Sequence, residues 1–404
     1  MNHGAPGTAL SSPGNPGRKR ILALALALLS LLALPAAARD GLGFTCDPTQ
    51  IDSVEAGMEA YLQALHIAPA LILRQMERDL GRLTYTLATP PGDTDTLSLH
   101  RRPEFRIGRE TVSLPTRGGK SRQVVTVSKK EILLALMQHG RLTEFAGSAC
   151  NLEALKEHIG LRQNIVAWAE NLNWIWPNGG PARWNKRYWD KGTPLPHVPV
   201  AAALQNAFDQ QGKYSLGCYT TTKLAIAQGI VQYFERSTAP PGRAALVRER
   251  LLADGDPLVN IEPPRLWRFE PDLDPADADQ PGKLVRQIDG VAAGNFVPGD
   301  WAYLLNTDPR SRENTGYEGS NTLYLGRNRF VDYFNDNRHG YSYREKLDEV
   351  YQWRNGVFSR ARDFRKIRRL SAQDYERLGK LPSEGGLLLD QRAVPYFFGY
   401  EALP

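Results

Sequence analysis

A change in hydrophobic periodicity along the chain constrains the fold most strongly. Residues 151–175 and 218–234 carry apolar side chains every three or four positions, which is typical of helices with one buried face. Further along, apolar and polar residues alternate at 322–325 and 330–333, which predicts antiparallel strands joined by a turn at 326–328. Helices followed by an antiparallel sheet predict an α+β fold.

The first residues, 1–38, have the pattern of a secretory signal peptide. A basic start at 17–20 precedes an apolar stretch at 21–34 and a run of small residues. The apolar stretch is too short to span a membrane comfortably. We therefore expect cleavage, no stable membrane span afterwards, and a secreted or periplasmic protein. Loss of three basic residues leaves 47 Lys and Arg against 44 Asp and Glu, a net charge of +3 that does not indicate nucleic-acid binding.

After the signal peptide we expect three parts. They are an N-terminal accessory region at 39–148, a catalytic domain at 149–360 and a C-terminal extension at 361–404. The accessory region is interpreted as mainly helical, with a helix over 53–83 that is broken near Pro69.

A second helix is expected to begin within the accessory region at Ser128. This residue is a good N-cap, and Glu131 three positions later would complete a capping box. A short strand over 121–127 is predicted to lead into this helix.

The chain contains three cysteines. In an oxidising compartment an even pair tends to form a disulfide, and an odd cysteine is a candidate reactive thiol. We expect Cys46 to bond to Cys150, which would join the mature N-terminus to the start of the main domain. The other two pairings stay open from the sequence alone. Cys218 would then be the odd cysteine.

Cys218 lies where a polar loop enters the helical segment 218–234. A thiol in the first turn of a helix feels the positive end of the helix dipole, which favours thiolate. Backbone N–H groups at the same end could hold an oxyanion. An inert buried cysteine is the commoner case at such a position. The odd cysteine count and the sheet that follows favour a nucleophile instead.

A cysteine nucleophile needs a proton acceptor within hydrogen-bond reach. Glu318 and Ser320 are two residues apart and would share one face of a strand, while Asp332 lies mid-strand and His339 follows. No spacing of His, Cys and Asp indicates zinc or another metal, and no glycine-rich phosphate loop precedes a helix. Neither a metal nor an organic cofactor is expected.

A tryptophan-rich loop lies between the two helical segments. Large aromatic side chains are usually core anchors. Our hypothesis is the alternative, that Trp184 and Trp189 of this loop line a substrate groove together with Tyr219, next to the cysteine. Such a groove would exclude water from the site.

Six segments occur in an order that points to a known family. They are LRQNIVAWAENL, RYWDKG, GKYSLGCYTTTKLA, GDWAYLLN, YEGSNTLYLGRNRFVDYF and HGYSYREKLDEVYQWRNG. From about Leu142 to Phe358 the chain resembles the bacterial protein-glutamine gamma-glutamyltransferases of the spore-coat type. These are small transglutaminases on an NlpC-like, papain-related core, with the nucleophile at a helix N-terminus packed on an antiparallel sheet.

The resemblance implies that Cys218 forms a thioester with a glutamine side chain and that a lysine resolves it to an isopeptide bond. The partners would be protein substrates bearing Gln and Lys. Gly217 stands where the family has a glutamate. Ser320 stands at the family's second glutamate, with Glu318 two residues earlier, and His339 matches its HG pair if a short insertion is allowed. The expected catalytic residues are Cys218, Glu318 and His339, with Ser320 and Asp332 as alternatives for the base.

Two other functions stay open on the same core. An NlpC-like cysteine peptidase or amidase would transfer the acyl group from cell-wall peptides to water. Such hydrolases carry a histidine where this chain has Ser320. A non-catalytic envelope protein would keep the core and lose the catalytic pair.

Overall fold

A computed structural model of the chain describes most residues from Asp40 onward. The described residues are 40–116, 118–170, 172–177, 180–236, 245, 285–288, 291–306, 316–317, 319–331, 340–354, 370–378 and 388–395. The predicted signal peptide at 1–38 lies outside them.

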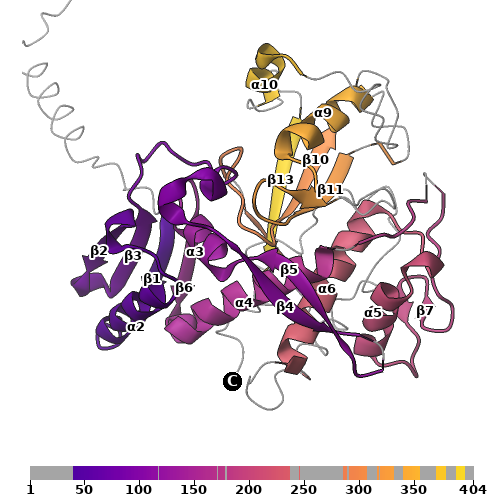
Figure 1. Cartoon of the computed structure of the whole chain (residues 1–404), viewed down its shortest axis with the longest axis horizontal. Coiled ribbons are helices and arrows are strands. Elements are labelled where there is room, and N and C mark those ends of the chain that lie inside the picture. Colours follow the sequence, from indigo (N-terminus) through magenta and orange to yellow (C-terminus); the bar gives the residue numbers. More distant parts are fainter. Residues whose placement is uncertain are drawn as a thin grey trace, which may run out of the picture. The chain divides into compact units, whose positions relative to one another are not determined.

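The accessory region is built around a four-stranded sheet rather than around helices. The sheet has the order β2-β3-β1-β6, in which β1 and β6 are parallel and the other pairs are antiparallel. Its elements are β1 (Gly41–Thr45), β2 (Ile72–Glu77), β3 (Arg82–Leu87), β6 (Leu142–Ala146) and the helix α2 (Ile51–Ala64). Figure 1 shows these strands in indigo and violet beside α2. The expectation of a mainly helical region is therefore wrong.

The predicted helix over 53–83 is correct only for its first half. It ends at Ala64, before Pro69, and the rest forms the antiparallel hairpin β2–β3. Residues of β3 alternate between partly exposed and buried, with Leu83, Tyr85 and Leu87 inside. That alternation places one face of the strand in the core, which a helix over the same residues would not do.

A long hairpin follows, formed by β4 (Arg109–Pro115) and β5 (Ser121–Val127), and it packs against the helix α4 (Leu152–Ala169; Figure 1). Helix α3 (Lys129–Met137) begins directly after it. The hydroxyl of Ser128 accepts a hydrogen bond from the Glu131 backbone N–H at 3.2 Å, which confirms the predicted N-cap.

The central helices are α4 (Leu152–Ala169), α5 (Val200–Asp209) and α6 (Cys218–Arg236). Most side chains of α4 and α6 are buried, and the two helices pack closely against each other. Gly229 permits this approach, because an added Cβ would lie 2.6 Å from the Cα of Ile165. Between α4 and α5 lies the small ribbon of β7 (Trp189–Asp190) and β8 (Thr193–Pro194).

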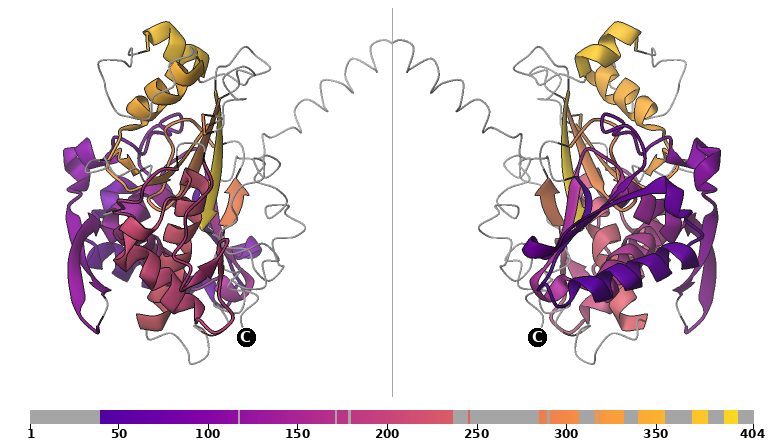
Figure 2. Two further views of the ribbon diagram at one scale, coloured as in Figure 1. Left: turned by 90° about the vertical axis from the view of Figure 1, so that its right-hand side faces the viewer. Right: turned by 90° about the vertical axis from the view of Figure 1, so that its left-hand side faces the viewer.

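The second sheet is antiparallel throughout, with the order β12-β11-β10-β13-β9. Its strands are β9 (Val285–Ile288), β10 (Trp301–Asn306), β11 (Gly319–Tyr324), β12 (Phe330–Val331) and β13 (Leu388–Pro395). The predicted antiparallel neighbours are β11 and β12. Figure 2 shows β13, in yellow, beside the orange strands, so the predicted C-terminal extension contributes a strand to this sheet.

Two helices, α9 (Tyr343–Arg354) and α10 (Ala372–Leu378), lie between β12 and β13 along the chain, and α9 packs on β10 and β11. Short 3-10 helices lie at Pro69–Leu71, Arg78–Leu80, Leu99–Arg101, Pro103–Phe105, Gly147–Ala149 and Gln211–Lys213. Helices combined with mixed and antiparallel sheets confirm the predicted α+β class. Among the residues that the structure describes, no helix is long and apolar enough to cross a membrane.

Candidate active site

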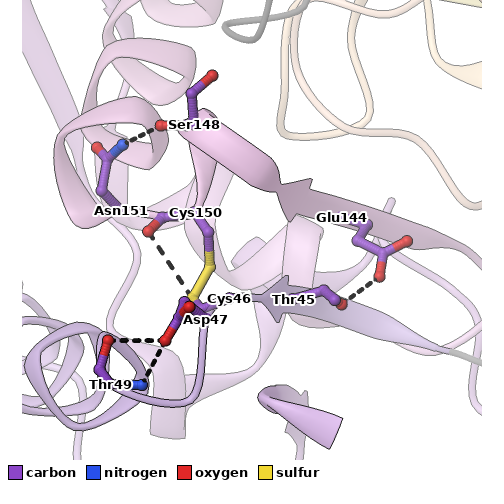
Figure 3. Close-up of a disulfide and its surroundings, with 8 residues drawn as sticks. All are labelled: Thr45, Cys46, Asp47, Thr49, Glu144, Ser148, Cys150 and Asn151. Carbon is purple, nitrogen blue, oxygen red and sulfur yellow. Dashed lines mark hydrogen bonds between the residues drawn. A yellow bond between two sulfur atoms is a disulfide. The ribbon is translucent and has the colours of Figure 1, made fainter.

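The disulfide fixes which cysteine is left for chemistry. Cys46 and Cys150 are bonded, with their Cα atoms 5.4 Å apart, as the sequence favoured. Figure 3 shows the bond between the end of β1 and the turn before α4, where the Asn151 side-chain amide donates a hydrogen bond to the Ser148 carbonyl at 2.8 Å. Cys218 is the cysteine outside this disulfide, and its side chain is buried.

Cys218 is the first residue of α6, as predicted. The backbone N–H of Thr221 donates to the Gly217 carbonyl at 3.1 Å and starts the helix. The hydroxyls of Thr221 and Thr222 both donate to the Cys218 carbonyl at 2.9 Å. The two threonine hydroxyls therefore brace the first turn of the helix through this carbonyl oxygen.

The loop before the cysteine is held from two sides. The Leu216 backbone N–H donates to the Ile175 carbonyl at 2.9 Å, and Ser215 and Arg183 exchange two backbone hydrogen bonds of 3.0 and 2.8 Å. The hydroxyl of Tyr214 donates to the Asn206 side chain at 2.7 Å. This bracing gives the residues ahead of Cys218 a defined path into the helix.

The strand β11 brings an amide to the sulfur. The Asn321 Nδ2 lies 3.5 Å from the Cys218 Sγ, and the Asn321 Oδ1 accepts a hydrogen bond from the Trp301 Nε1 at 2.8 Å. The Trp301 ring lies 5.1 Å from the ring of Tyr219, the residue after the cysteine. Sequence reasoning missed Asn321, although it lies directly after the candidate Ser320.

Ser320 lies on the other face of β11, because successive side chains of a strand point to opposite faces. Its register partner Leu304 packs with Leu347 and Trp353 of α9, whereas Trp301 belongs to the apolar core that contains Cys218. The Ser320 side chain is fully buried, and its hydroxyl has no hydrogen-bond partner among the described residues. Its role as an alternative base stays a prediction.

Glu318, Asp332 and His339 lie outside the described residues. Their roles stay predictions.

The predicted groove residues lie in two different settings. Trp184 and Trp189 are buried, with ring centroids 5.1 Å apart, and Trp184 meets Tyr214 edge to face at 6.1 Å. This is core packing of β7 and of the segment that precedes it. Tyr219 is partly exposed and lies against Trp301. Tyr219 is therefore the member of the predicted groove that the structure brings next to the cysteine.

A buried charge cluster lies at the start of β10, directly before Trp301. The Asp300 carboxylate accepts hydrogen bonds from the guanidinium groups of Arg141 at 2.6 Å and Arg162 at 2.9 Å, and from the Val297 backbone N–H at 2.8 Å. Burial raises the pKa of Asp300, but the two arginines outweigh burial and lower the pKa to about 2. Asp300 is therefore a carboxylate at neutral pH, and it anchors the first residue of the strand.

The cluster extends to a neutral histidine. The Arg162 Nε donates to the His158 Nε2 at 2.8 Å, so this ring nitrogen must be an acceptor. Burial first, and then the charges of Arg162 and Arg141, hold the pKa of His158 well below its usual value. His158 therefore serves as a neutral acceptor within the core. In the described part of the chain, no group of three or more His, Cys, Asp or Glu side chains is arranged to hold a metal ion.

Comparison with known proteins gives one consistent relationship. No protein-family model matches the chain. It is 24% identical over 236 residues to proteins named protein-glutamine gamma-glutamyltransferase from Bacillus cereus (strain AH820), Bacillus anthracis (strain A0248) and Bacillus thuringiensis subsp. konkukian. Each match covers 55% of this chain and 69% of the relative.

A solved transglutaminase from Geobacillus stearothermophilus, without its C-terminal extension, is similar at 17% identity with a TM-score of 0.39. The match covers 62% of this chain and 97% of that one. The Bacillus proteins carry the relationship. The resemblance and the transglutaminase class predicted from the sequence are therefore confirmed: this chain is similar to bacterial enzymes named protein-glutamine gamma-glutamyltransferase.

Proposed function

We propose that the protein is a protein-glutamine gamma-glutamyltransferase that uses Cys218 as its nucleophile. The observation that carries the proposal is the position of this thiol, at the first residue of a buried helix and 3.5 Å from the side-chain amide of Asn321. A helix N-terminus and an N–H donor both favour the charged form of a thiol. The relationship to the Bacillus enzymes supplies the reaction.

The reaction has two acyl-transfer steps. The Cys218 sulfur attacks the side-chain carbonyl carbon of a glutamine, the carbon–nitrogen bond breaks, and ammonia leaves with the proton that the thiol gives up. A lysine ε-amine then attacks the thioester, its carbon–nitrogen bond forms, and the sulfur leaves as thiolate. Glu318 and His339 are the predicted groups that would carry the protons, with Ser320 and Asp332 as alternatives.

The core of the protein supports an NlpC-like, papain-related arrangement. Helix α6 packs on β11 of the antiparallel sheet with Cys218 at the end that meets Asn321. We also propose that residues 1–38 direct export and are removed. The disulfide between Cys46 and Cys150 supports this, because such bonds form mainly in oxidising compartments.

Amine incorporation tests the activity. Purified protein is incubated with a fluorescent primary amine and a glutamine-bearing acceptor protein, and covalent labelling of the acceptor is measured. We expect labelling by the wild type and none by Cys218→Ala, whose fold is checked by its thermal melt. Val125→Ala, at an exposed site on β5, is the control and should label like the wild type. Equal labelling by Cys218→Ala would refute the role of the thiol.

Two further measurements separate the alternatives. Release of peptide fragments from cell-wall sacculi without added amine would favour the hydrolase. Absence of both reactions would favour the envelope protein without catalysis.

Export is tested by the N-terminal sequence of protein recovered outside the cytoplasm. We expect it to begin near Arg39, and an intact Met1 on exported protein would contradict cleavage.

A further inference from the structure

Asn321 is a buried amide with both ends of its side chain engaged. It lies in the middle of β11, opposite Tyr303 of β10, and its side chain is 1% exposed. The Nδ2 faces the Cys218 Sγ at 3.5 Å, and the Oδ1 faces the Trp301 Nε1 at 2.8 Å. The two contacts come from residues on two different elements, α6 and β10.

The tryptophan determines which way the amide points. An indole N–H can only donate a hydrogen bond, so the atom of Asn321 that it meets must be the carbonyl oxygen. In the opposite orientation two N–H donors would face each other, and the buried indole would lose its acceptor, which is costly. The NH₂ group of Asn321 is therefore held toward the sulfur.

An N–H aimed at sulfur does more for the thiolate than for the thiol. Hydrogen bonds to an ionised acceptor are about twice as strong as those to a neutral one. The amide therefore shifts the thiol equilibrium in the same direction as the N-terminus of α6. The buried setting strengthens the effect, because water does not compete for the donor.

We infer that Asn321 is a catalytic residue that stabilises the Cys218 thiolate through its side-chain N–H, and that Trp301 is a positioning residue that holds this amide in orientation. The inference rests on the proposed function. It adds to the site Asn321, a residue that the sequence analysis did not single out. It also assigns the indole a task beyond its contact with Tyr219.

The chain offers a matched pair of substitutions. Asn321→Asp keeps the shape of the side chain and an oxygen for the Trp301 indole, and replaces only the N–H donor with a carboxylate oxygen. Asn321→Ala removes both contacts. Asn206→Asp is the control, because Asn206 is buried in α5 and its side-chain oxygen already accepts from Tyr214 and Asn185. An aspartate there keeps both bonds.

The readout is the pH midpoint of the ultraviolet thiolate absorbance, with the Cys218→Ala spectrum subtracted. We expect the midpoint to rise by about 1 to 2 pH units in Asn321→Ala and by more in Asn321→Asp. We expect a smaller rise in Trp301→Phe and no change in Asn206→Asp. The predicted bases Glu318, Asp332 and His339 are present in every variant, so the differences report on the amide. The rate of alkylation by iodoacetamide at neutral pH should fall in the same order.

An identical midpoint in the wild type and Asn321→Asp would overturn the inference, since a packing role alone is preserved by that substitution. Should the aspartate variant fail to fold, Trp301→Phe decides in its place, and an unchanged midpoint there has the same meaning. Amine incorporation is measured in parallel. If the wild type incorporates no amine but the Asn321 variants shift the thiolate midpoint, the proposed function is refuted and the role of Asn321 stands. If the wild type incorporates amine but the Asn321 variants leave the midpoint unshifted, the proposed function stands and the role of Asn321 is refuted.

Discussion

Protonated Glu131 contributes to the free energy of unfolding, and this contribution should be lost as the pH rises. Its side chain is 2% exposed, and the Oε1 accepts a hydrogen bond from the Arg327 backbone N–H at 2.6 Å. The Oε2 has no partner among the described residues. Burial raises the pKa of Glu131 from 4.5 to about 7, against the lowering effects of the Arg327 bond and of nearby arginine charges.

The size of the effect follows from the two pKa values. A difference from 4.5 to about 7 corresponds to about 3 kcal/mol at ~1.4 kcal/mol per pH unit. The folded protein binds this proton more tightly than the unfolded chain does. The stabilisation is therefore fully present below about pH 4.5, and it is lost as the pH rises through about 7. Glu131→Gln keeps an acceptor for Arg327 but cannot titrate.

The assay is urea unfolding of the wild type and Glu131→Gln from about pH 4 to about pH 8. The quantity of interest is the difference between their free energies of unfolding, because other titrating groups cancel in it. We expect this difference to shift by about 3 kcal/mol in favour of the glutamine variant as the pH rises. Glu153→Gln, at a side chain that is 80% exposed, should give a flat difference. Parallel curves for wild type and Glu131→Gln would refute the reasoning.

Two further substitutions test the packing around the site. Asp300→Asn leaves two buried guanidinium groups without their carboxylate, so we expect a loss of about 3–5 kcal/mol in urea unfolding at neutral pH. Because the pKa of Asp300 is lowered to about 2, this deficit should shrink as the pH falls from about 4 toward 2. Gly229→Ala would place a Cβ 2.6 Å from the Cα of Ile165, so the strain of about 1–3 kcal/mol should exceed the gain in helix propensity. A melting temperature of Gly229→Ala at or above that of the wild type would contradict this expectation.

Local patterns predicted several elements well. The start of α6 at Cys218, the N-cap at Ser128 and the turn between β11 and β12 were all readable from short stretches. The capping box was only half correct, because the Glu131 carboxylate bonds the Arg327 backbone instead of returning to its own helix end. That partner is 196 residues away, beyond the reach of any local rule.

The hairpin β2–β3 was misassigned for a related reason. Its helical interpretation extended the clear period of α2 across Pro69, although β3 carries alternating buried residues. The sheet depends on pairing of β3 with β1, which lies about forty residues earlier and supplies the partner for every position from Arg82 to Tyr85. Strand propensity is largely a matter of such neighbours, which a single segment does not reveal.

In the candidate active site, too, local sequence patterns predicted one part and only tertiary packing determined the other. The nucleophile was predicted from its helix and from the cysteine count, whereas the strand residue that meets it was not. Ser320 and Asn321 are adjacent, and only the face that packs on α6 decides between them. A shift of one residue exchanges the two faces of a strand. Sequence pattern identified β11, but the tertiary packing on α6 and α9 selected the side.

Asp300 and Trp301 are consecutive residues, but the first acts on the stability of the fold and the second on the chemistry of the thiol. Their effects can therefore be separated by experiment. Asp300 holds the start of β10 through charges on α4 and on the segment before β6, whereas Trp301 orients the amide at the sulfur. If the charge cluster acts only on the fold, Asp300→Asn lowers the free energy of unfolding and leaves the thiolate midpoint of the folded protein unchanged. Trp301→Phe, one residue later, should move that midpoint while costing less stability, because the aromatic body remains packed. A midpoint that moved with Asp300→Asn would mean that the cluster sets the register of β10 against β11.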